Sequence, residues 1–356
     1  MDIEKFLEEK ASLIDKVIER YLPRKFSENS ILFQVTPPVY SYNLETIDKA
    51  IAEPIWDMLD RGGKRWRPVL FLLICKALGK KEDDYIDFAA ISEVIHNGTL
   101  VIDDIEDSSE LRRGKPCTYK LYGIDISVNV GNAMYYMPLL SLMTKEIRLP
   151  AEVLCGVYEV YVQEMINLSM GQAMDIAWHK GLANADNITE TDYLQMCAYK
   201  TGTLARMAAR MAAVISGAEK NLVDKLGRFA ESIGVAFQMQ DDILDLTSQE
   251  FAKKKGGVGQ DITEGKRTLM VIYTLKNANE HDKKRLIEIL NMHTNNQTLR
   301  DEAIALMQKY RAITHTAQTA EKIVADSWNE VKYLLPTPEA KEKVKAFSEF
   351  LIKRSM

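Results

Sequence analysis

Residues 85–107 are apolar on nearly every side until they end in the acidic cluster Asp103-Asp104-Ile105-Glu106-Asp107. A helix that is hydrophobic all round is typical of the buried centre of a large protein, so this stretch predicts the central helix of a bundle. The pattern DDxxD returns at Asp241-Asp242-Ile243-Leu244-Asp245, again at the end of a long apolar helical stretch. The two segments favour an all-α bundle in which each half contributes one acidic cluster.

Helical periodicity dominates the rest of the chain, and convincing strand alternation is missing. An apolar stripe predicts a first helix that Pro23 ends, followed by an irregular connection over 25–44. A capping box is expected at Thr189 to Asp192. Further helices are expected at about 45–61, 127–145, 150–179, 190–216, 220–246, 266–277, 282–291, 298–313, 315–334 and 338–353, with loops at 180–189, 247–265 and 292–297.

No linker rich in Pro, Gly or Ser divides the 356 residues. We therefore expect a single domain over 1–356, built of roughly a dozen helices, with residues 1–44 as an N-terminal helix plus irregular connection. The net charge of −5 excludes a global basic field of the kind that attracts nucleic acid, so any recognition of anions must be local.

The cysteines are far apart and form no CxxC pair, which argues against a zinc site or a disulfide framework. The acidic N-terminus lacks the apolar core of a signal peptide, and no run of about 18 apolar residues is present to span a bilayer. These features predict a cytoplasmic protein without a transmembrane segment.

The spacing within each aspartate cluster predicts a metal site. Residues i and i+4 share one face of a helix, so Asp103 lies above Asp107 and Asp241 above Asp245. Like charges at that distance repel, and clustered carboxylates on rigid helices are the oxygen ligands that Mg²⁺ or Mn²⁺ takes alongside water and substrate phosphates. The alternative is a solvated acidic face, which fits poorly with clusters that follow apolar segments.

Basic residues near these clusters predict phosphate binding. Arg112-Arg113-Gly114 follows the first cluster, and two adjacent arginine forks point in different directions, so they can serve two neighbouring anions. A second basic group, Gly62-Gly63-Lys64-Arg65-Trp66-Arg67, offers backbone amides as well as cations. His96 lies about two helical turns before Asp103. Taken singly, such a loop is a weak signal, and a lone histidine is more often structural.

Six motifs together resemble the trans-isoprenyl diphosphate synthases, from about residue 45 to the C-terminus. Within that family, residues 96–108 look most like the geranylgeranyl diphosphate synthases. The resemblance implies an isoprenoid synthase type I fold, in which the helices surround a central cavity, and a homodimer. The motifs, in order, are Gly62-Gly63-Lys64-Arg65-Trp66-Arg67-Pro68, His96 through Asp107, Arg112-Arg113-Gly114, Gly171-Gln172, Lys200-Thr201-Gly202 and Phe237-Gln238-Met239-Gln240-Asp241-Asp242.

The resemblance implies a magnesium-dependent prenyl transfer. Asp103, Asp107 and Asp241 would ligate three Mg²⁺ ions around the diphosphate of an allylic substrate, which is dimethylallyl, geranyl or farnesyl diphosphate. Asp104, Asp242 and Asp245 would be further or water-mediated ligands. Arg112, Lys200 and Lys266 would neutralise the charge that develops on the leaving diphosphate. Isopentenyl diphosphate would attack the resulting carbocation while held by Gly63, Lys64, Arg67, His96 and Arg113.

Other positions that match the family have expected roles that the residue type alone supports only weakly. Thr201 and Gln238 are expected to hydrogen-bond substrate and Phe237 to shield the cation, although each alone would more often be a packing residue. Asp175 is expected to act through a metal-bound water. One departure is Gly257, preceded by Lys253-Lys254-Lys255, where many family members carry a Gly-Lys pair. Either this loop shifts a lysine into the allylic site, or Lys200 and Lys266 act alone.

Small residues on the first aspartate helix predict the chain length of the product. One helical turn of about 5.4 Å is close to the length of one isoprene unit, so residues one turn apart act as graduated stops. Gly98 and Thr99 are small where enzymes that stop at C15 often carry an aromatic residue. We therefore expect a C20 product, with Ile95 deeper in the tunnel and Tyr135 and Tyr136 as a floor.

Three other functions remain as alternatives. A farnesyl or longer-chain polyprenyl diphosphate synthase would share the site and differ in chain length. A terpene cyclase uses one diphosphate substrate and would not need the second basic group. A noncatalytic partner subunit would lose metal ligands, whereas both clusters are intact here.

Overall fold

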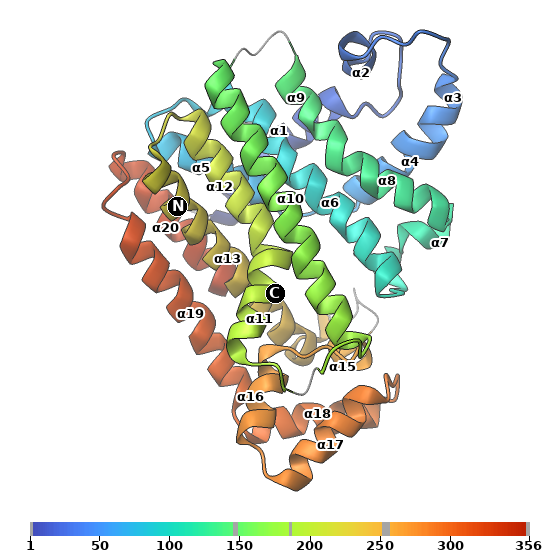
Figure 1. The fold of residues 1–356 in the computed structure, drawn as a ribbon, viewed down its shortest axis with the longest axis vertical. Helices are drawn as coiled ribbons and strands as arrows, with labels where there is room; N and C mark the ends of the chain where they lie inside the picture. Colours follow the sequence, from blue (N-terminus) through green and yellow to red (C-terminus); the bar gives the residue numbers. More distant parts are fainter. Residues whose placement is uncertain (1–2, 145–148, 185–186, 251–256, 354–356) are drawn as a thin grey trace. The chain divides into compact units, whose positions relative to one another are not determined.

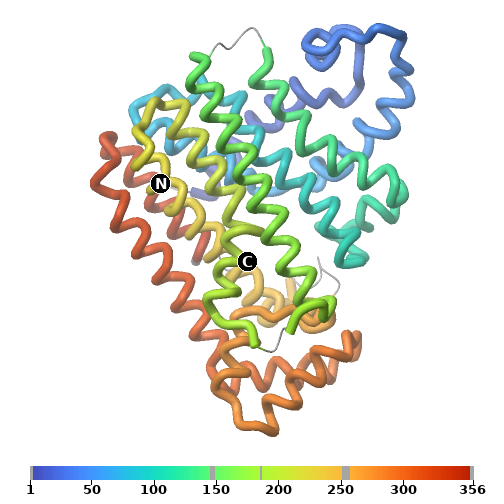
Figure 2. Tube along the Cα trace, viewed as in Figure 1, coloured from blue at the N-terminus to red at the C-terminus, as the bar shows by residue number. Residues whose placement is uncertain are grey.

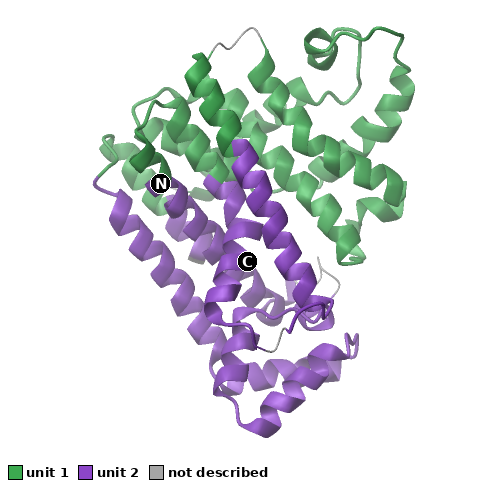
Figure 3. Ribbon diagram, viewed as in Figure 1, with its two compact units in different colours: residues 1–160, 207–224, 334–346 green, residues 161–206, 225–333, 347–356 purple. Residues whose placement is uncertain are grey.

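A computed structural model of the protein describes residues 3–144, 149–184, 187–250 and 257–353. The chain forms two compact units (Figure 3). Unit 1 contains residues 1–160, 207–224 and 334–346, and unit 2 contains residues 161–206, 225–333 and 347–356. The single domain over 1–356 stays a prediction.

Unit 1 is built around the first aspartate helix, α6 (Ile86–Glu106), which packs against α1 (Ile3–Tyr21), α5 (Trp66–Ala77) and α8 (Ile124–Tyr136). Most apolar side chains of α6 are buried, as expected of a helix without a polar face. The other elements of this unit are α2 (Ile31–Val35), α3 (Leu44–Ile47), η1 (Asp48–Ala52), α4 (Glu53–Asp60), η2 (Glu82–Tyr85), β1 (Leu111–Arg112), β2 (Lys115–Pro116), α7 (Thr118–Tyr122), η3 (Met137–Leu139) and α9 (Leu140–Met143).

Four helices contribute residues to both units. They are α10 (Ala151–His179), α12 (Thr203–Ile215), α13 (Lys220–Thr247) and α20 (Pro338–Lys353) (Figure 1). No helix in the described ranges is long and apolar enough to cross a membrane.

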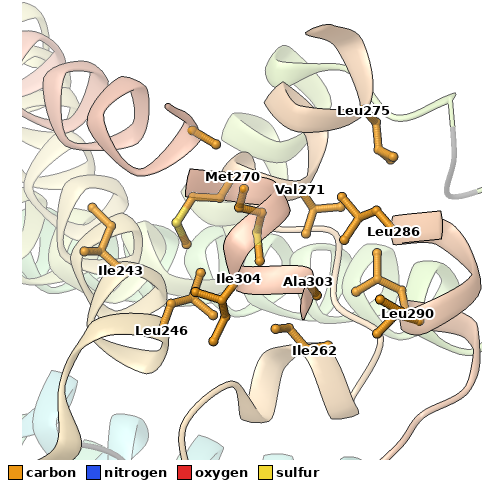
Figure 4. Close-up of a cluster of buried hydrophobic side chains, with 13 residues drawn as sticks. Ile243, Leu246, Ile262, Met270, Val271, Leu275, Leu286, Leu290, Ala303 and Ile304 are labelled. Atoms are coloured by element: carbon orange, nitrogen blue, oxygen red, sulfur yellow. The ribbon is translucent and has the colours of Figure 1, made fainter. Parts of the chain in front are cut away.

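In unit 2, the second aspartate cluster lies beside a buried hydrophobic core. The other elements of unit 2 are α11 (Glu190–Cys197), η5 (Ala198–Gly202), α15 (Gln260–Thr263), α16 (Leu269–Asn277), α17 (Glu280–Asn291), α18 (Gln297–Lys309) and α19 (Ala312–Val331). Ile243 and Leu246, which flank the acidic residues of α13, belong to a buried cluster that includes Ile262 of α15 and Met270 of α16 (Figure 4). This core packs the end of α13 against the short helix α15.

The all-α prediction is confirmed, and the bounds of α1, α6, α10 and α13 agree with the predicted ranges within a few residues. The capping box is present, since Thr189 accepts a hydrogen bond from the Asp192 backbone amide and Asp192 accepts one from the backbone amide of Thr189. Two predicted helices contain a π-helical turn that periodicity does not reveal: η1 lies within 45–61 and η5 within 190–216.

Several boundaries were wrong. The connection over 25–44 contains the helix α2 (Figure 2), and the predicted loop 247–265 contains α15. The predicted helix 298–313 ends at Lys309, because Arg311 takes a left-handed backbone with φ of 59° and starts α19. The hairpin of β1 and β2 was missed because each strand has only two residues, too few for alternation to show.

Candidate active site

A group of buried arginines lies at the start of α5 in unit 1. Arg65 and Arg67 are 3% and 4% exposed. Arg67 places its guanidinium over the Trp66 ring, 4.4 Å from the centroid. Among the described residues, the buried Nε of Arg67 has no hydrogen-bond partner. A buried cation without a carboxylate is costly, so this arrangement suits the binding of an anion from outside the protein.

Arg113 reaches the same region from the hairpin that follows α6. Arg113 and Gly114 are the two turn residues between β1 and β2, and both have positive φ, 53° and 77°. Two consecutive residues with positive φ are the mark of a type I′ hairpin turn. The turn directs Arg113 inward, where its Nη1 donates to the Asn97 Oδ1 at 3.2 Å.

Gly63 lies between two of these arginines. A Cβ added at Gly63 would come within 3.2 Å of Arg65 Nη1 and 3.3 Å of Arg113 Nη2. Gly63 also has a φ of 148°, which residues with a side chain rarely adopt. Gly63 and Lys64 are exposed, so the glycine backbone lies at the open side of the arginine group.

The electrostatics of this group suit the binding of an anion. Burial lowers the pKa of Arg67 to about 10, and Glu93 opposes this shift. Burial also lowers the pKa of Arg113 to about 10, with Arg65 among the contributing cations. The pKa of His96 is well below its ordinary value because of burial and the neighbouring arginines. His96 is therefore neutral at physiological pH, and one ring nitrogen can donate a hydrogen bond while the other accepts.

The first aspartate cluster divides into two parts. The Asp107 amide donates to the Asp103 carbonyl at 2.9 Å, which confirms that the two residues lie one helical turn apart. Both side chains are partly exposed. Asp104 is instead fully buried and accepts from Arg112, at 2.8 Å to Nε and 2.5 Å to Nη2. The structure thus leaves Asp103 and Asp107 accessible and engages Asp104, a predicted further ligand, with an arginine.

Arg112 connects Asp104 with Asp103. Its Nη2 also lies 3.6 Å from the Asp103 carboxylate. Burial raises the pKa of Asp104, and Arg112 opposes that shift. Burial would lower the pKa of Arg112, but the charge of Asp104 and their hydrogen bond raise it above the ordinary value. Arg112 is thus held as a cation next to the accessible carboxylate of Asp103, and its role toward a leaving diphosphate stays a prediction.

The second aspartate cluster, in unit 2, is also divided. Asp241 is partly exposed, whereas Asp242 is 4% exposed. The Tyr193 hydroxyl donates to Asp242 Oδ2 at 2.7 Å, and the Gln238 amide donates to Oδ1 at 2.8 Å. The hydroxyl of Thr201 donates to Gln238 at 2.9 Å. Both carboxylate oxygens of Asp242 are therefore bound by protein groups.

Asp245 is fully buried and holds the segment before α15. Its carboxylate accepts the backbone amide of Asp261 at 3.1 Å, and its carbonyl accepts the Gly259 amide at 2.9 Å. Asp241 is partly exposed while Asp245 is buried, so the two aspartates of this cluster differ in their surroundings. As ligands, Asp242 and Asp245 stay predictions.

Lys200 lies in the π-helical turn η5 and donates to Asp175 at 2.5 Å. A Cβ at Gly171 of α10 would lie 2.3 Å from the Lys200 backbone nitrogen, so only glycine allows this close approach. The π turn and Gly171 together place the lysine against Asp175. The predicted interaction of Asp175 with a metal-bound water stays a prediction.

Lys266 follows α15, and its amide donates to the Asp261 carbonyl at 2.9 Å while its side chain pairs with Glu264. With Asp242 and Asp261 it lines a cavity of about 10 Å³, the size of a single water. The Phe237 side chain is partly buried. Of the lysine loop, Lys253, Lys254 and Lys255 lie outside the described residues, so both readings of that loop stay open.

The accessible carboxylates fit the expected Mg²⁺ without a cage made only of protein. The described residues contain no group of three or more His, Cys, Asp or Glu side chains that could hold a metal ion. Mg²⁺ is usually bound through one or two carboxylates together with substrate phosphates and water. Asp103 and Asp107, one turn apart and partly exposed, match that requirement.

The predicted chain-length residue Gly98 lies where α6 and α8 approach each other. A Cβ at Gly98 would lie 2.8 Å from the Met134 Cβ and 3.1 Å from the Gly131 carbonyl, so Gly98 allows the two helices to pack closely. Tyr135 lies beside it, with Cε1 3.3 Å from the same point. Tyr136 is 65% exposed, so its side chain lies on the surface of unit 1.

The other two chain-length residues are also accounted for. Thr99 donates to the His96 carbonyl at 2.7 Å, and Ile95 is fully buried. Tyr135 is therefore the predicted chain-length residue that the structure places next to the Gly98 position.

Three residues near the predicted site were missed by sequence reasoning. Glu93 and Asn97 contact the arginine group, and Tyr193 contacts Asp242. The position of Glu93 three residues before His96 was an available signal, because residues three or four apart lie on the same face of a helix. Asn97 lies four residues after Glu93 on that helix. Tyr193 gave no signal, since its distance of 49 residues from Asp242 is bridged only by the fold.

Comparison with known proteins identifies the family. Residues 48–307 match the family model described as polyprenyl synthetase. A geranylgeranyl diphosphate synthase of Sulfolobus acidocaldarius is 32% identical over 332 residues, which cover 92% of this chain and 97% of that protein. A short chain isoprenyl diphosphate synthase of Methanothermobacter thermautotrophicus is 31% identical, with 83% of this chain and 88% of that protein covered.

A solved structure shares the fold over the whole chain. The crystal structure of geranylgeranyl pyrophosphate synthetase from Pyrococcus horikoshii superposes with a TM-score of 0.83 and 29% identity, covering 99% of each chain. The chain belongs to the polyprenyl synthetase family. The protein is a prenyltransferase that elongates isoprenoid diphosphates. Enzymes of this family generally depend on metal.

Proposed function

We propose that this enzyme condenses isopentenyl diphosphate with an allylic diphosphate, releasing diphosphate and giving geranylgeranyl diphosphate. The observation that carries the proposal is the arginine group of unit 1. Arg67 and Arg113 are cations whose pKa is lowered by burial against the opposing charge of Glu93, and neither forms an ion pair with a carboxylate among the described residues. A second diphosphate would supply the missing charge, and a condensing enzyme needs two diphosphate substrates, whereas a cyclase needs one.

The two substrates are assigned to different residues. The diphosphate of isopentenyl diphosphate would bind Arg67 and Arg113, with hydrogen bonds from the Gly63 backbone, Lys64 and neutral His96. A diphosphate has several oxygens, so it can accept from two guanidinium forks together. Binding there removes the cost of the unpaired buried charges, which makes the site selective for an anion of high charge.

The allylic diphosphate would bind through Mg²⁺ at the accessible carboxylates Asp103, Asp107 and Asp241. When bound, the metal ions neutralise the diphosphate and make it a leaving group. Arg112, held as a cation by Asp104, and Lys200 would stabilise the charge that develops on the departing oxygen. Asp175 holds the ammonium of Lys200 in place before substrate binds.

The remaining groups would guide the carbocation and its quenching. Phe237 would face the cation with its ring, and Thr201 and Gln238 would contact the allylic substrate. The released diphosphate would accept the proton, so no side-chain base is needed. Three Mg²⁺ ions per site are proposed, with Mn²⁺ as the alternative metal, and Lys266 would complete the set of cations.

The C20 product rests on the relatives and on Tyr135. The relatives compared above include synthases named for geranylgeranyl diphosphate. Gly98 no longer supports the assignment, because α8 fills the space beside it. Tyr135 is the remaining candidate for limiting the chain. A farnesyl or longer-chain product is the alternative, and it would leave the assignment of the two diphosphate sites unchanged.

We also propose a homodimer. On α8, Ile124, Val128 and Tyr136 are 58%, 40% and 65% exposed and follow one another at multiples of four residues. Such spacing makes one apolar stripe, which a soluble enzyme would cover with a second copy of its own chain. Location in the cytoplasm stays a prediction from the sequence.

The test is to supply dimethylallyl, geranyl and farnesyl diphosphates separately with radiolabelled isopentenyl diphosphate and Mg²⁺, and to size the products by chromatography. We expect label in a C20 product from each primer that is accepted, and no label without a primer. Products that stop at C15 would overturn the chain length. Unlabelled cyclic hydrocarbons from the primer alone would overturn the condensation.

A further inference from the structure

Arg65 is a buried arginine whose guanidinium is bound by groups of the protein. Its backbone is left-handed, with φ of 48°, which is uncommon for a residue with a side chain. Its Nε donates to Asp15 at 2.9 Å, its Nη1 to Glu93 at 3.0 Å and its Nη2 to the Leu59 carbonyl at 3.0 Å. All three groups of the guanidinium are therefore used within the protein.

The contacts of Arg65 continue to the arginine group. Glu93 is 1% exposed, and the oxygen that accepts from Arg65 also accepts from the Asn97 side-chain amide at 3.1 Å. Asn97 is fully buried and offers its own oxygen to Arg113 at 3.2 Å. A continuous chain of hydrogen bonds thus runs from Asp15 of α1 through Arg65, Glu93 and Asn97 to the guanidinium of Arg113.

We propose that Asp15 and Glu93 are positioning residues that hold Arg113, through Arg65 and Asn97, in the orientation that binds the diphosphate of isopentenyl diphosphate. The inference rests on the proposed function of Arg113. It gives the N-terminal helix a part in the substrate site, although α1 precedes the residues 48–307 that match the family.

The geometry explains how a change at Asp15 reaches the substrate. Arg65 Nη1 and Arg113 Nη2 flank the same glycine, at 3.2 Å and 3.3 Å from the Cβ position of Gly63. A shift of Arg65 therefore moves the surroundings of Arg113 and of the Gly63 backbone. Without Asp15, the charge of Arg65 is compensated by Glu93 alone, which weakens the hold of Glu93 on Asn97.

A second ion pair of α1 provides a matched control. Arg20 of α1 donates to both oxygens of Asp87 on α6, at 3.0 Å and 3.2 Å. This pair also ties α1 to the core of unit 1, but neither residue contacts Arg65, Glu93 or Asn97 in any described interaction. If α1 matters only because it is docked, loss of either pair should have the same effect.

The experiment measures kcat and the KM of each substrate for Asp15→Asn, Asp15→Glu and Asp87→Asn, and the binding of isopentenyl diphosphate to the metal-free enzymes by calorimetry. Asp15 is 45% exposed at its side chain, so Asp15→Asn should fold. We expect its KM for isopentenyl diphosphate to rise about threefold to tenfold, the worth of one ordinary hydrogen bond, because the change reaches Arg113 only through Arg65, Glu93 and Asn97. Its kcat and its KM for the allylic diphosphate should stay within about twofold of wild type. The calorimetric affinity for isopentenyl diphosphate should fall in parallel with the rise in KM, and Asp15→Glu should restore both the affinity and the KM for isopentenyl diphosphate.

Asp87→Asn should leave both KM values unchanged. The inference is overturned if Asp15→Asn behaves like Asp87→Asn, or if its two KM values rise together. Arg113→Gln separates this failure from failure of the proposed function. If Arg113→Gln does not weaken isopentenyl diphosphate binding, the site itself is wrong, whereas a weakened Arg113→Gln with normal Asp15→Asn refutes only the positioning role.

Discussion

Replacement of Arg67 by methionine should make the free enzyme more stable and the substrate complex weaker. The folded chain lowers the pKa of Arg67 from 12.5 to about 10. Because the folded state binds this proton less tightly than the unfolded state, the charged side chain opposes folding at every pH below about 10. The shift corresponds to about 3 kcal/mol against the folded state.

Part of that gain is lost when the guanidinium leaves the Trp66 ring, a contact worth about 1 kcal/mol. Methionine fills a similar volume, so the net expectation for Arg67→Met is an increase of about 2 kcal/mol in the free energy of unfolding. Arg65 is the matched control two residues away, since it is equally buried but paired with Asp15 and Glu93. Arg65→Met should lower the free energy of unfolding by about 3–5 kcal/mol, because it leaves a buried carboxylate uncompensated.

The assay is urea unfolding with and without isopentenyl diphosphate. The ligand should stabilise the wild type by mass action and have almost no effect on Arg67→Met. The reasoning is refuted if Arg67→Met is destabilised as strongly as Arg65→Met, or if the ligand stabilises Arg67→Met as much as the wild type.

Three other perturbations test separate parts of the account. The pKa of His96 is lowered by burial and neighbouring arginines, so the free energy of unfolding should fall below pH 6.5, by up to about 1.4 kcal/mol per pH unit. His96→Asn should lose that share of the pH dependence, and an unchanged urea profile would contradict it. Asp103→Ala should reduce kcat by orders of magnitude in a folded enzyme. Asp104→Ala should lower the free energy of unfolding by about 3 kcal/mol, because the Arg112 charge loses the carboxylate of Asp104. Equal free energies of unfolding for the two variants would contradict this division. Gly98→Ala should destabilise by about 1–3 kcal/mol without altering product length, while Tyr135→Ala should lengthen the product, as chromatography of labelled products would reveal. The opposite pattern would restore Gly98 as the chain-length residue.

The helices that carry the site were predictable because their sequence patterns are local. The apolar surroundings of α6 and the i, i+4 spacing of Asp103 and Asp107 follow directly from helix geometry, and the structure has the expected backbone bond between them. The same rule did not predict the surroundings of Asp104. Its burial under Arg112 depends on a hairpin of two-residue strands, which has no periodicity to detect.

Spacing alone also could not distinguish a small residue that opens a tunnel from one that allows close packing. Gly98 satisfies both descriptions in the sequence, and only the fold shows that Met134 of α8 lies 2.8 Å from its Cβ position. The surroundings of Asp242 and Asp245 were not predictable for a similar reason. Their partners, Tyr193 and the Asp261 amide, come from other elements, so only the fold brings them together.

The most direct test of the central claim is steady-state kinetics of Arg113→Gln with each substrate varied in turn. The account predicts a KM for isopentenyl diphosphate raised about a hundredfold, because a buried charge-assisted contact to diphosphate is lost, with the KM for the allylic diphosphate within about twofold of wild type. A rise in the allylic KM alone, or an equal rise in both, would contradict the assignment of the arginine group to the second diphosphate.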